Sequence, residues 1–176
     1  NPATKKPLTP EDLAHIFSLE CSKQELDTEH AWIDIPEEVL DMYKYYRATP
    51  LVRAYAMEKA LDTPAHIYFK NESVNPLGSH KINSALPQCY YCREEGVTNV
   101  TTETGAGQWG AALSYAAKVF GLESAVYQVK ITLQQKPYRG ILMRTFGATV
   151  TGSPSMSTRA GKDIITRDPN NSGSLG

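Results

Sequence analysis

Apolar and polar positions along this chain form two kinds of stretch. Short β-branched or apolar runs predict four strands, at 65–70, 97–102, 125–129 and 148–151. Longer stretches, most of them ending at a glycine, predict four helices, over 80–95, 107–120, 133–146 and 157–166. Strands that alternate with helices in this way are typical of a parallel sheet with right-handed crossovers. The predicted fold class is therefore α/β, a parallel sheet with flanking helices.

The first part of the chain has a different pattern. Thr9, Pro10 and the acids that follow are a helix-start signal, which predicts a short helix from Thr9 to about Leu19. A second helix is predicted from Pro36 to about Tyr45, and the segment 47–51 ends it. We therefore expect a helical extension over 1–46 and an α/β region over 47–176.

One proline lies inside a predicted helix. Pro87 falls within 80–95, where a missing N–H and a bulky ring disturb helical hydrogen bonding. We expect Pro87 to kink this helix or to split it in two.

Composition excludes several kinds of partner. The chain has 18 basic and 19 acidic residues, so nothing in its charge indicates a nucleic-acid partner or an electrostatic membrane anchor. No apolar run approaches the ~20 residues that a membrane-spanning helix needs. The first residues are polar and lack the apolar core of a secretion signal. These features predict a cytoplasmic protein.

Three cysteines, an odd number without repeated spacing, argue against a disulfide framework. Cys89 and Cys92 have the spacing of some metal and redox sites. A structural zinc site needs a second ligand pair, and the four histidines offer none. A redox pair would precede a helix, whereas these residues lie late in one. We interpret them, with Cys21, as small apolar side chains near a core, and predict no metal site.

The segment 78–83, Gly-Ser-His-Lys-Ile-Asn, places Lys81 on the first turn of a predicted helix. A helix N-terminus carries partial positive charge, so a lysine there is disfavoured by about 0.3–1 kcal/mol. Such a lysine sheds its proton more readily, and the free amine can attack an aldehyde. The alternative is a solvated surface charge, which is the commoner role of a lysine at a helix start.

The segment 102–108 places Glu103 where a strand runs into a glycine-bearing loop. Glycines let successive N–H groups converge, and the dipole of the following helix adds to them, so Gly105 and Gly107 predict an anion-binding turn. A carboxylate beside it can transfer a proton near a bound acid. The alternative is that Glu103 caps the helix or pairs with a lysine. Because ligands bind beyond the carboxyl ends of parallel strands, we expect both segments to share one site.

Together the two segments strongly resemble the tryptophan synthase beta family. The run 76–83 is followed, 22 residues after Lys81, by Glu-Thr-Gly-Ala-Gly-Gln at 103–108. The runs 49–51, 135–139 and 146–150 agree with the same resemblance. Trp109 replaces the histidine of the common beta subunit, which points to the divergent second type. The resemblance implies the N-terminal portion of a fold-type II pyridoxal-phosphate enzyme.

This resemblance implies a role for each motif residue. Lys81 would hold pyridoxal phosphate and remove the proton from the substrate's α-carbon, His80 would contact the cofactor's phosphate, and Asn83 its ring hydroxyl region. Glu103 would protonate the departing hydroxyl of serine and stabilise the charge that develops on indole. The amino-acid carboxylate would bind, largely through main-chain N–H groups, to Thr104, Gly105, Ala106, Gly107 and Gln108, with Trp109 at the rim.

The implied reaction joins L-serine and indole to give L-tryptophan and water. A homodimer and an alpha subunit are the implied partners. The family's phosphate-binding loop lies in the second half of its fold, so we expect residues 1–176 alone to be inactive. Two alternatives stay open, namely another fold-type II lyase, such as serine or threonine dehydratase or threonine synthase, and a non-catalytic truncated scaffold.

Overall fold

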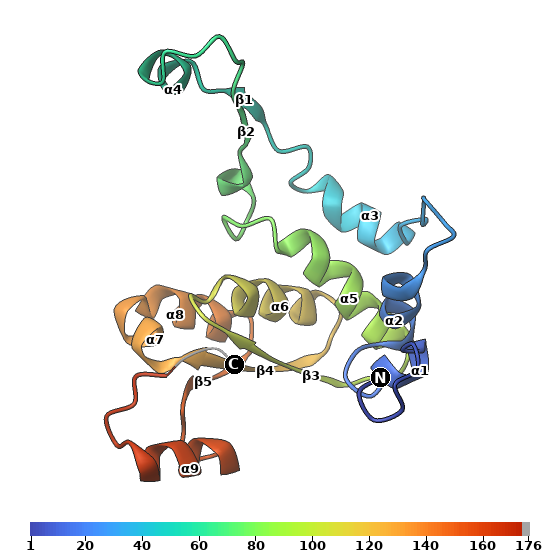
Figure 1. The fold of residues 1–176 in the computed structure, drawn as a ribbon, viewed down its shortest axis with the longest axis vertical. Coiled ribbons are helices and arrows are strands. Elements are labelled where there is room, and N and C mark those ends of the chain that lie inside the picture. The colour runs from blue at the N-terminus through green and yellow to red at the C-terminus, as the bar shows by residue number, and fades with distance from the viewer. Residues whose placement is uncertain (174–176) are drawn as a thin grey trace.

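A three-stranded parallel sheet forms the centre of the computed structural model, which describes residues 1–173 (Figure 1). Its strands are β3 (Asn99–Thr104), β4 (Glu123–Val129) and β5 (Thr149–Ser153), in the order β3-β4-β5. Tyr127 of β4 lies opposite Glu103 on one side and Thr151 on the other. The α/β fold class predicted from the sequence is confirmed.

Helices cover one face of this sheet. The layer nearest the strands contains α6 (Gln108–Val119) and α8 (Pro137–Thr145), and α5 (Ile82–Glu94) packs on the other side of α6. Helix α7 (Lys130–Gln135) directly follows β4, and α9 (Arg159–Arg167) lies beyond the opposite face (Figure 1).

Two groups of elements precede this α/β layer. The helices are α1 (Pro10–Leu13), α2 (Leu19–Leu26) and α3 (Glu37–Lys44). A projecting arm follows, made of β1 (Leu51–Arg53), α4 (Tyr55–Ala60) and β2 (Tyr68–Lys70) (Figure 1). The 3-10 turn η1 (Glu72–Val74) then leads back toward α5. The expected domain division at residue 46 stays a prediction.

Helix α6 is buried on two sides because its side chains are small. On one side Ala112, Ala116 and Ala117 join the apolar cluster formed with α3 and α5. On the other side, Ala111 packs in a second apolar cluster, between α6 and the strands. An added Cβ on Gly110 would lie 2.7 Å from Met143 Sδ, 2.7 Å from Val126 Cγ1 and 2.9 Å from Thr104 Cγ2. Small residues therefore set how closely α6 approaches the sheet.

Two of the expected helices have other bounds than predicted. The helix expected from Thr9 to Leu19 ends at Leu13, and a separate helix that was not expected, α2, starts at Leu19, where Ser18 accepts a hydrogen bond from the main-chain N–H of Cys21. The helix expected over 133–146 is two helices, since Pro137 begins α8 and holds Lys136 in a non-helical conformation. Of the two outcomes expected for Pro87, a split does not occur, because α5 continues from Ile82 to Glu94, and a kink stays a prediction.

The first predicted strand also differs from expectation. Only Tyr68–Lys70 of the expected run 65–70 is a strand, and it pairs antiparallel with β1 rather than joining the parallel sheet. Neither β1 nor α4 was expected from the sequence. The alternation of strands and helices therefore begins at β3.

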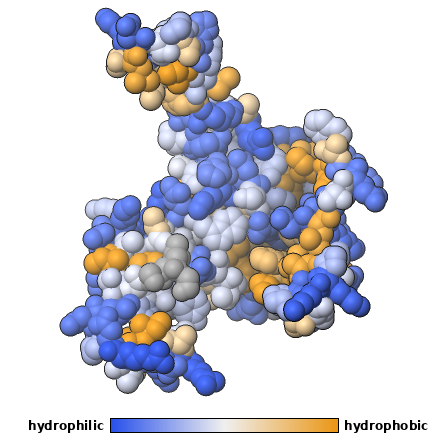
Figure 2. All heavy atoms as spheres, viewed as in Figure 1, coloured by the Kyte–Doolittle hydropathy of each residue, from blue (hydrophilic) through white to orange (hydrophobic). Residues whose placement is uncertain are grey.

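The arm carries apolar side chains that this part of the chain leaves uncovered. Figure 2 shows them at the top of the view, away from the sheet and its helices. Six large apolar residues of the arm are about half exposed or more, namely Leu51, Tyr55, Met57, Leu61, Tyr68 and Phe69. Within residues 1–173, no helix combines the length and apolar composition needed to cross a membrane.

The packing of α6 generates a stability prediction. Gly110→Ala would force a methyl group into space held by Met143, Val126 and Thr104, so we expect a loss of about 1–3 kcal/mol in the free energy of unfolding. Gly152→Ala is the matched control, because its added Cβ would meet neighbours at 3.6 Å and beyond. Urea unfolding of the full-length protein checks this. Equal stability of the two variants would contradict the close approach of α6.

Candidate active site

The turn before Lys81 is held by one buried side chain, that of Asn75. Its amide nitrogen donates to the carbonyl of Ser79 at 2.9 Å, and its oxygen accepts from the main-chain N–H of Leu77 at 3.0 Å and of Ser79 at 3.3 Å. Its nitrogen also reaches Glu72 Oε2 at 3.1 Å. Hydrogen bonds from Thr49 and Asn75 lower the pKa of the Glu72 carboxyl. The turn is therefore fixed by these polar contacts together with the buried apolar side chain of Leu77.

Lys81 is the residue that begins α5. It is half-buried, and its main-chain carbonyl accepts the N–H of Ala85 at 3.0 Å, the first full helical turn. The side chain of Lys81 makes no capping bond, and the first turn carries no acidic residue. His80, which precedes Lys81, is exposed. The structure therefore places Lys81 at a helix start without a carboxylate, where the hydroxyl of Ser79 accepts the main-chain N–H of Lys81 at 3.4 Å.

Asn83, on the first turn of α5, accepts hydrogen bonds from two tyrosines, Tyr43 in α3 and Tyr46 just after that helix. The hydroxyl of Tyr46 donates to Asn83 Oδ1 at 2.9 Å, and the hydroxyl of Tyr43 donates to the main-chain carbonyl of Asn83. In a regular helix that carbonyl would accept the N–H of residue 87, which is Pro87 and has none. Burial raises the pKa of both tyrosines, so they are donors at neutral pH.

The glycine-bearing loop joins β3 to α6. Strand β3 extends to the buried Thr104, and Gly107 starts α6 with a left-handed φ of 91°. An added Cβ there would lie 2.9 Å from Arg139 Cβ, so this position requires glycine in both conformation and space. The hydroxyl of Thr132 donates to the carbonyl of Gly105 and ties the loop to α7.

The start of α6 has the features of an anion site. No side chain caps it, and its first turn contains no acidic residue. Ala106 and Gln108 are exposed, so the loop can be reached from outside. Unpaired N–H groups at a helix start together with the helix dipole favour a bound carboxylate or phosphate. The side chain of Trp109 points back along β3, where its indole N–H donates to Thr102 Oγ1 at 2.8 Å.

Glu103 is a strand residue rather than a loop residue. It is exposed, on the opposite face of β3 from the buried Thr104 that contacts α6. It belongs to none of the ion pairs formed within residues 1–173, and it does not cap α6. Neither of the two structural roles considered for this carboxylate is therefore realised.

Arg139 of α8 connects the two motifs. Its guanidinium donates to the carbonyl of Leu77, in the turn before Lys81, at 3.1 Å. Its Cβ lies against Gly107, as the close approach described above shows. One side chain therefore contacts both segments. The expectation that both would follow neighbouring strands of one sheet was wrong, because β2 lies outside that sheet.

Sequence reasoning missed the residues that position these motifs. Asn75, Tyr43 and Tyr46 hold the turn and first helical residues around Lys81, and Arg139 joins them to the loop. The Asn75-Pro76 pair signalled a turn, and the run containing Arg139 was noticed only as part of the family resemblance. Contacts between residues so far apart have no local sequence signal.

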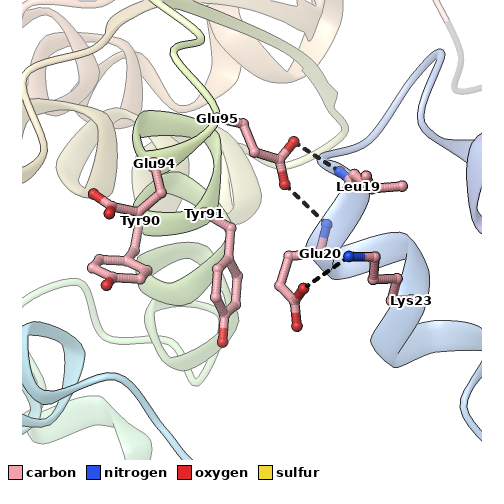
Figure 3. A pocket seen from close by; sticks show the side chains of 7 residues that line it. All are labelled: Leu19, Glu20, Lys23, Tyr90, Tyr91, Glu94 and Glu95. Carbon is pink, nitrogen blue, oxygen red and sulfur yellow. Dashed lines mark hydrogen bonds and ion pairs between the residues drawn. The ribbon is translucent and has the colours of Figure 1, made fainter.

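Pockets and metal-type clusters give no further site at these motifs. One pocket, with a volume of about 390 Å³, lies between α2 and α5, and another, of about 780 Å³, lies along α3 (Figure 3 shows the first). Neither is lined by Lys81 or Glu103. In the described part of the chain, no three His, Cys, Asp or Glu side chains are arranged to hold a metal ion.

Comparison with known families identifies the chain's relatives. Residues 42–171 match the family described as pyridoxal-phosphate dependent enzyme. The chain belongs to that family. This confirms the resemblance that the two motifs indicated. Pyridoxal phosphate is the cofactor of this family.

Individual members of the pyridoxal-phosphate family are about half identical to this chain. Tryptophan synthase beta chain 2 of Thermotoga maritima is 53% identical over 176 residues, which are 100% of this chain and 42% of the relative. The protein of the same name from Aquifex aeolicus is 51% identical, with 40% of it covered. Tryptophan synthase beta chain of Thermococcus gammatolerans is 50% identical over 177 residues, with 40% covered. The chain thus spans about two fifths of these relatives.

The residues at the motifs fit a pyridoxal-phosphate site in part. Lys81 supplies a primary amine, which condenses with aldehydes, at a half-buried position. Gln128, fully buried at the end of β4, lies 3.3 Å from the position of a Cβ on Gly107, and its Oε1 has no hydrogen-bond partner among the described residues. This orphaned polar atom behind the loop is consistent with a further polar group binding there.

The contact between Tyr43 and α5 can be tested by a double-mutant cycle. Tyr43→Phe leaves the carbonyl of Asn83 without a donor, so we expect a loss of about 1–3 kcal/mol in unfolding free energy. In a Pro87→Ala background the loss should be smaller by about 1 kcal/mol, since residue 87 then supplies the helical N–H.

Tyr46→Phe is the matched control for this cycle. It removes a bond to the side chain of Asn83, which residue 87 cannot replace, so its effect should be the same in both backgrounds. Denaturant unfolding of the four variants and their parents measures the coupling. Identical losses for Tyr43→Phe with and without Pro87 would show that the proline does not create the need for this hydroxyl.

Proposed function

We propose that the full-length protein containing this chain joins L-serine and indole to form L-tryptophan and water. The observation that supports this most strongly is the joint placement of the segments around Lys81 and Gly107 against one side chain, Arg139. An amine and an anion-binding helix start then serve one bound amino acid. About 50% identity to tryptophan synthase beta chains supports the choice of reaction.

The loop binds the substrate's carboxylate in this proposal. No side chain caps the first N–H groups of α6, which follow Gly107, whose φ of 91° only glycine adopts readily. Thr104, Gly105, Ala106, Gly107 and Gln108 form the binding turn, with the main chain of Trp109 at its rim. The carboxylate is thereby oriented relative to α5, and the dipole of α6 favours its charge.

Lys81 and Glu103 move protons in this proposal. Pyridoxal phosphate, when bound, supplies an electron sink for the carbanion formed at the substrate's α-carbon. The amine of Lys81 accepts the α-proton, and Glu103, exposed and unpaired with any cation in residues 1–173, donates a proton to the departing hydroxyl. His80 contacts the cofactor's phosphate, and Asn83 contacts its ring hydroxyl region. The hydroxyl of Tyr46 orients Asn83.

The wider assignments stay predictions. A homodimer, an alpha subunit that supplies indole, and a cytoplasmic location are each expected from the resemblance or the composition. Inactivity of residues 1–176 alone is expected because the family's phosphate loop belongs to its second half.

Substitution of Lys81 and Glu103 tests the proposal. Lys81→Ala should abolish tryptophan formation, because the amine that accepts the proton is gone. Glu103→Gln should retain the cofactor's absorbance and lower the rate about 10²–10⁴-fold, the effect of losing a general acid. Glu123→Gln is the matched control. Glu123 is a carboxylate on the same face of the sheet as Glu103, but it is the first residue of β4 and lies at the other end of the sheet. Normal tryptophan synthesis by the Glu103 variant would refute the role of Glu103.

A second assay separates the nearest alternative. A dehydratase of the same fold would convert serine to pyruvate whether or not indole is present, whereas the proposed enzyme should switch to tryptophan when indole is added. Both products are measured in one reaction of the full-length protein. Pyruvate as the main product in the presence of saturating indole would favour the dehydratase.

A further inference from the structure

The chain's three cysteines, far apart in the sequence, gather between α2 and α5. Cys21 is on α2, and Cys89 and Cys92 are on α5. Cys21 lies close enough to both others that a negative charge on it would raise the pKa of Cys89 and of Cys92. All three are free thiols in this structure. Nothing in the proposed reaction uses them.

Two polar contacts fix how α2 and α5 align. The carboxylate of Glu95, just after α5, accepts the main-chain N–H groups of Leu19 and Glu20 at 2.8 and 2.9 Å, and so caps the start of α2 (Figure 3). One turn further along each helix, Gln24 Nε2 donates to the hydroxyl of Tyr91 at 3.0 Å. The helices therefore run antiparallel, with 19–20 beside 95 and 24 beside 91.

This alignment places Cys21 and Cys92 on facing helices, in the stretch between the Glu95 contact and the Gln24 contact. Cys21 follows Glu20 and precedes Gln24 by three residues, while Cys92 lies between Tyr91 and Glu95 on the facing helix. Both cysteines are half-buried, whereas Cys89 is 1% exposed within the apolar cluster of α5 and α6. An oxidant in solution can therefore reach the pair Cys21 and Cys92 but not Cys89.

We propose that Cys21 and Cys92 form a reversible disulfide that fastens α2 to α5. The co-reactant is a small-molecule disulfide such as oxidised glutathione. One protein thiolate attacks it and releases one glutathione thiol, and the second protein thiolate then attacks the mixed disulfide and releases another. Two thiols of the protein are oxidised, one disulfide is reduced to two thiols, and the two protons pass to glutathione.

The surroundings of the pair set the speed of this exchange. Burial raises the pKa of Cys21 and of Cys92, and the carboxylates of Glu95 and, for Cys21, Glu20 raise the pKa further. Because only the thiolate reacts, exchange should be slow at pH 7 and about tenfold faster for each pH unit until the thiols ionise. The cross-link is therefore a response to sustained oxidation.

Non-reducing peptide mapping of the full-length protein tests the proposal. The protein is incubated with oxidised glutathione at pH 8.5, remaining thiols are alkylated, and the sample is digested with trypsin without reduction. We expect the peptide 6–23 joined to the peptide 82–93, at their summed mass less two hydrogens and with one alkyl group added on Cys89. Cys89→Ala should keep this product and Cys92→Ser should lose it.

Two further measurements keep the result decisive if a variant folds poorly. In the wild-type protein, oxidation should remove two alkylatable thiols from this region and leave the thiol of Cys89 reactive after denaturation. The oxidised wild type should also melt several degrees higher than the reduced one, since the link joins distant parts of the chain. Mixed disulfides with glutathione without a cross-link, or a cross-link to Cys89, would overturn the proposal.

Discussion

The close approach of α6 to the strands and to α5 governs the geometry of the α/β layer. This helix is covered by strands on one side and by α5 on the other, and most of its buried residues are alanine or glycine. Gly110 lets the helix start lie directly against Thr104 at the end of β3. The loop between them is consequently short and turned by Gly107. The geometry of the candidate anion site therefore follows from packing as much as from the loop sequence.

The second motif is held by a different kind of interaction. Around Lys81 the chain has a polar turn closed by Asn75 and a helix whose freed carbonyl is satisfied from α3. Pro87 removes one helical hydrogen bond, and Tyr43 replaces it from another element. Helix α3 is thus joined to the first turn of α5, two residues after Lys81. Arg139 then links this assembly to the glycine-bearing loop.

Sequence patterns located most of the α/β layer because its signals are local. Glycines end or begin α5, α6 and α8, and β-branched runs mark the strands of the parallel sheet. The errors occur where distant contacts or prolines decide. Helix α2 is capped partly by Glu95, which is too distant in the sequence for a local pattern around Leu19 to include it. The break at Lys136 had a local signal, the following Pro137, which was taken for an early helical position. The Lys81 and Glu103 motifs were recognisable, whereas Asn75, Tyr46 and Arg139 needed coordinates.

The weak pairing of the arm has a consequence for local unfolding. A two-stranded antiparallel ribbon is only marginally stable in water, and three residue pairs join β1 to β2. Its large apolar side chains face outward, so opening it exposes little additional apolar surface. Amide protons of the arm should therefore exchange with deuterium long before those of β4, which is bonded on both sides. The arm should therefore open locally without disturbing the parallel sheet.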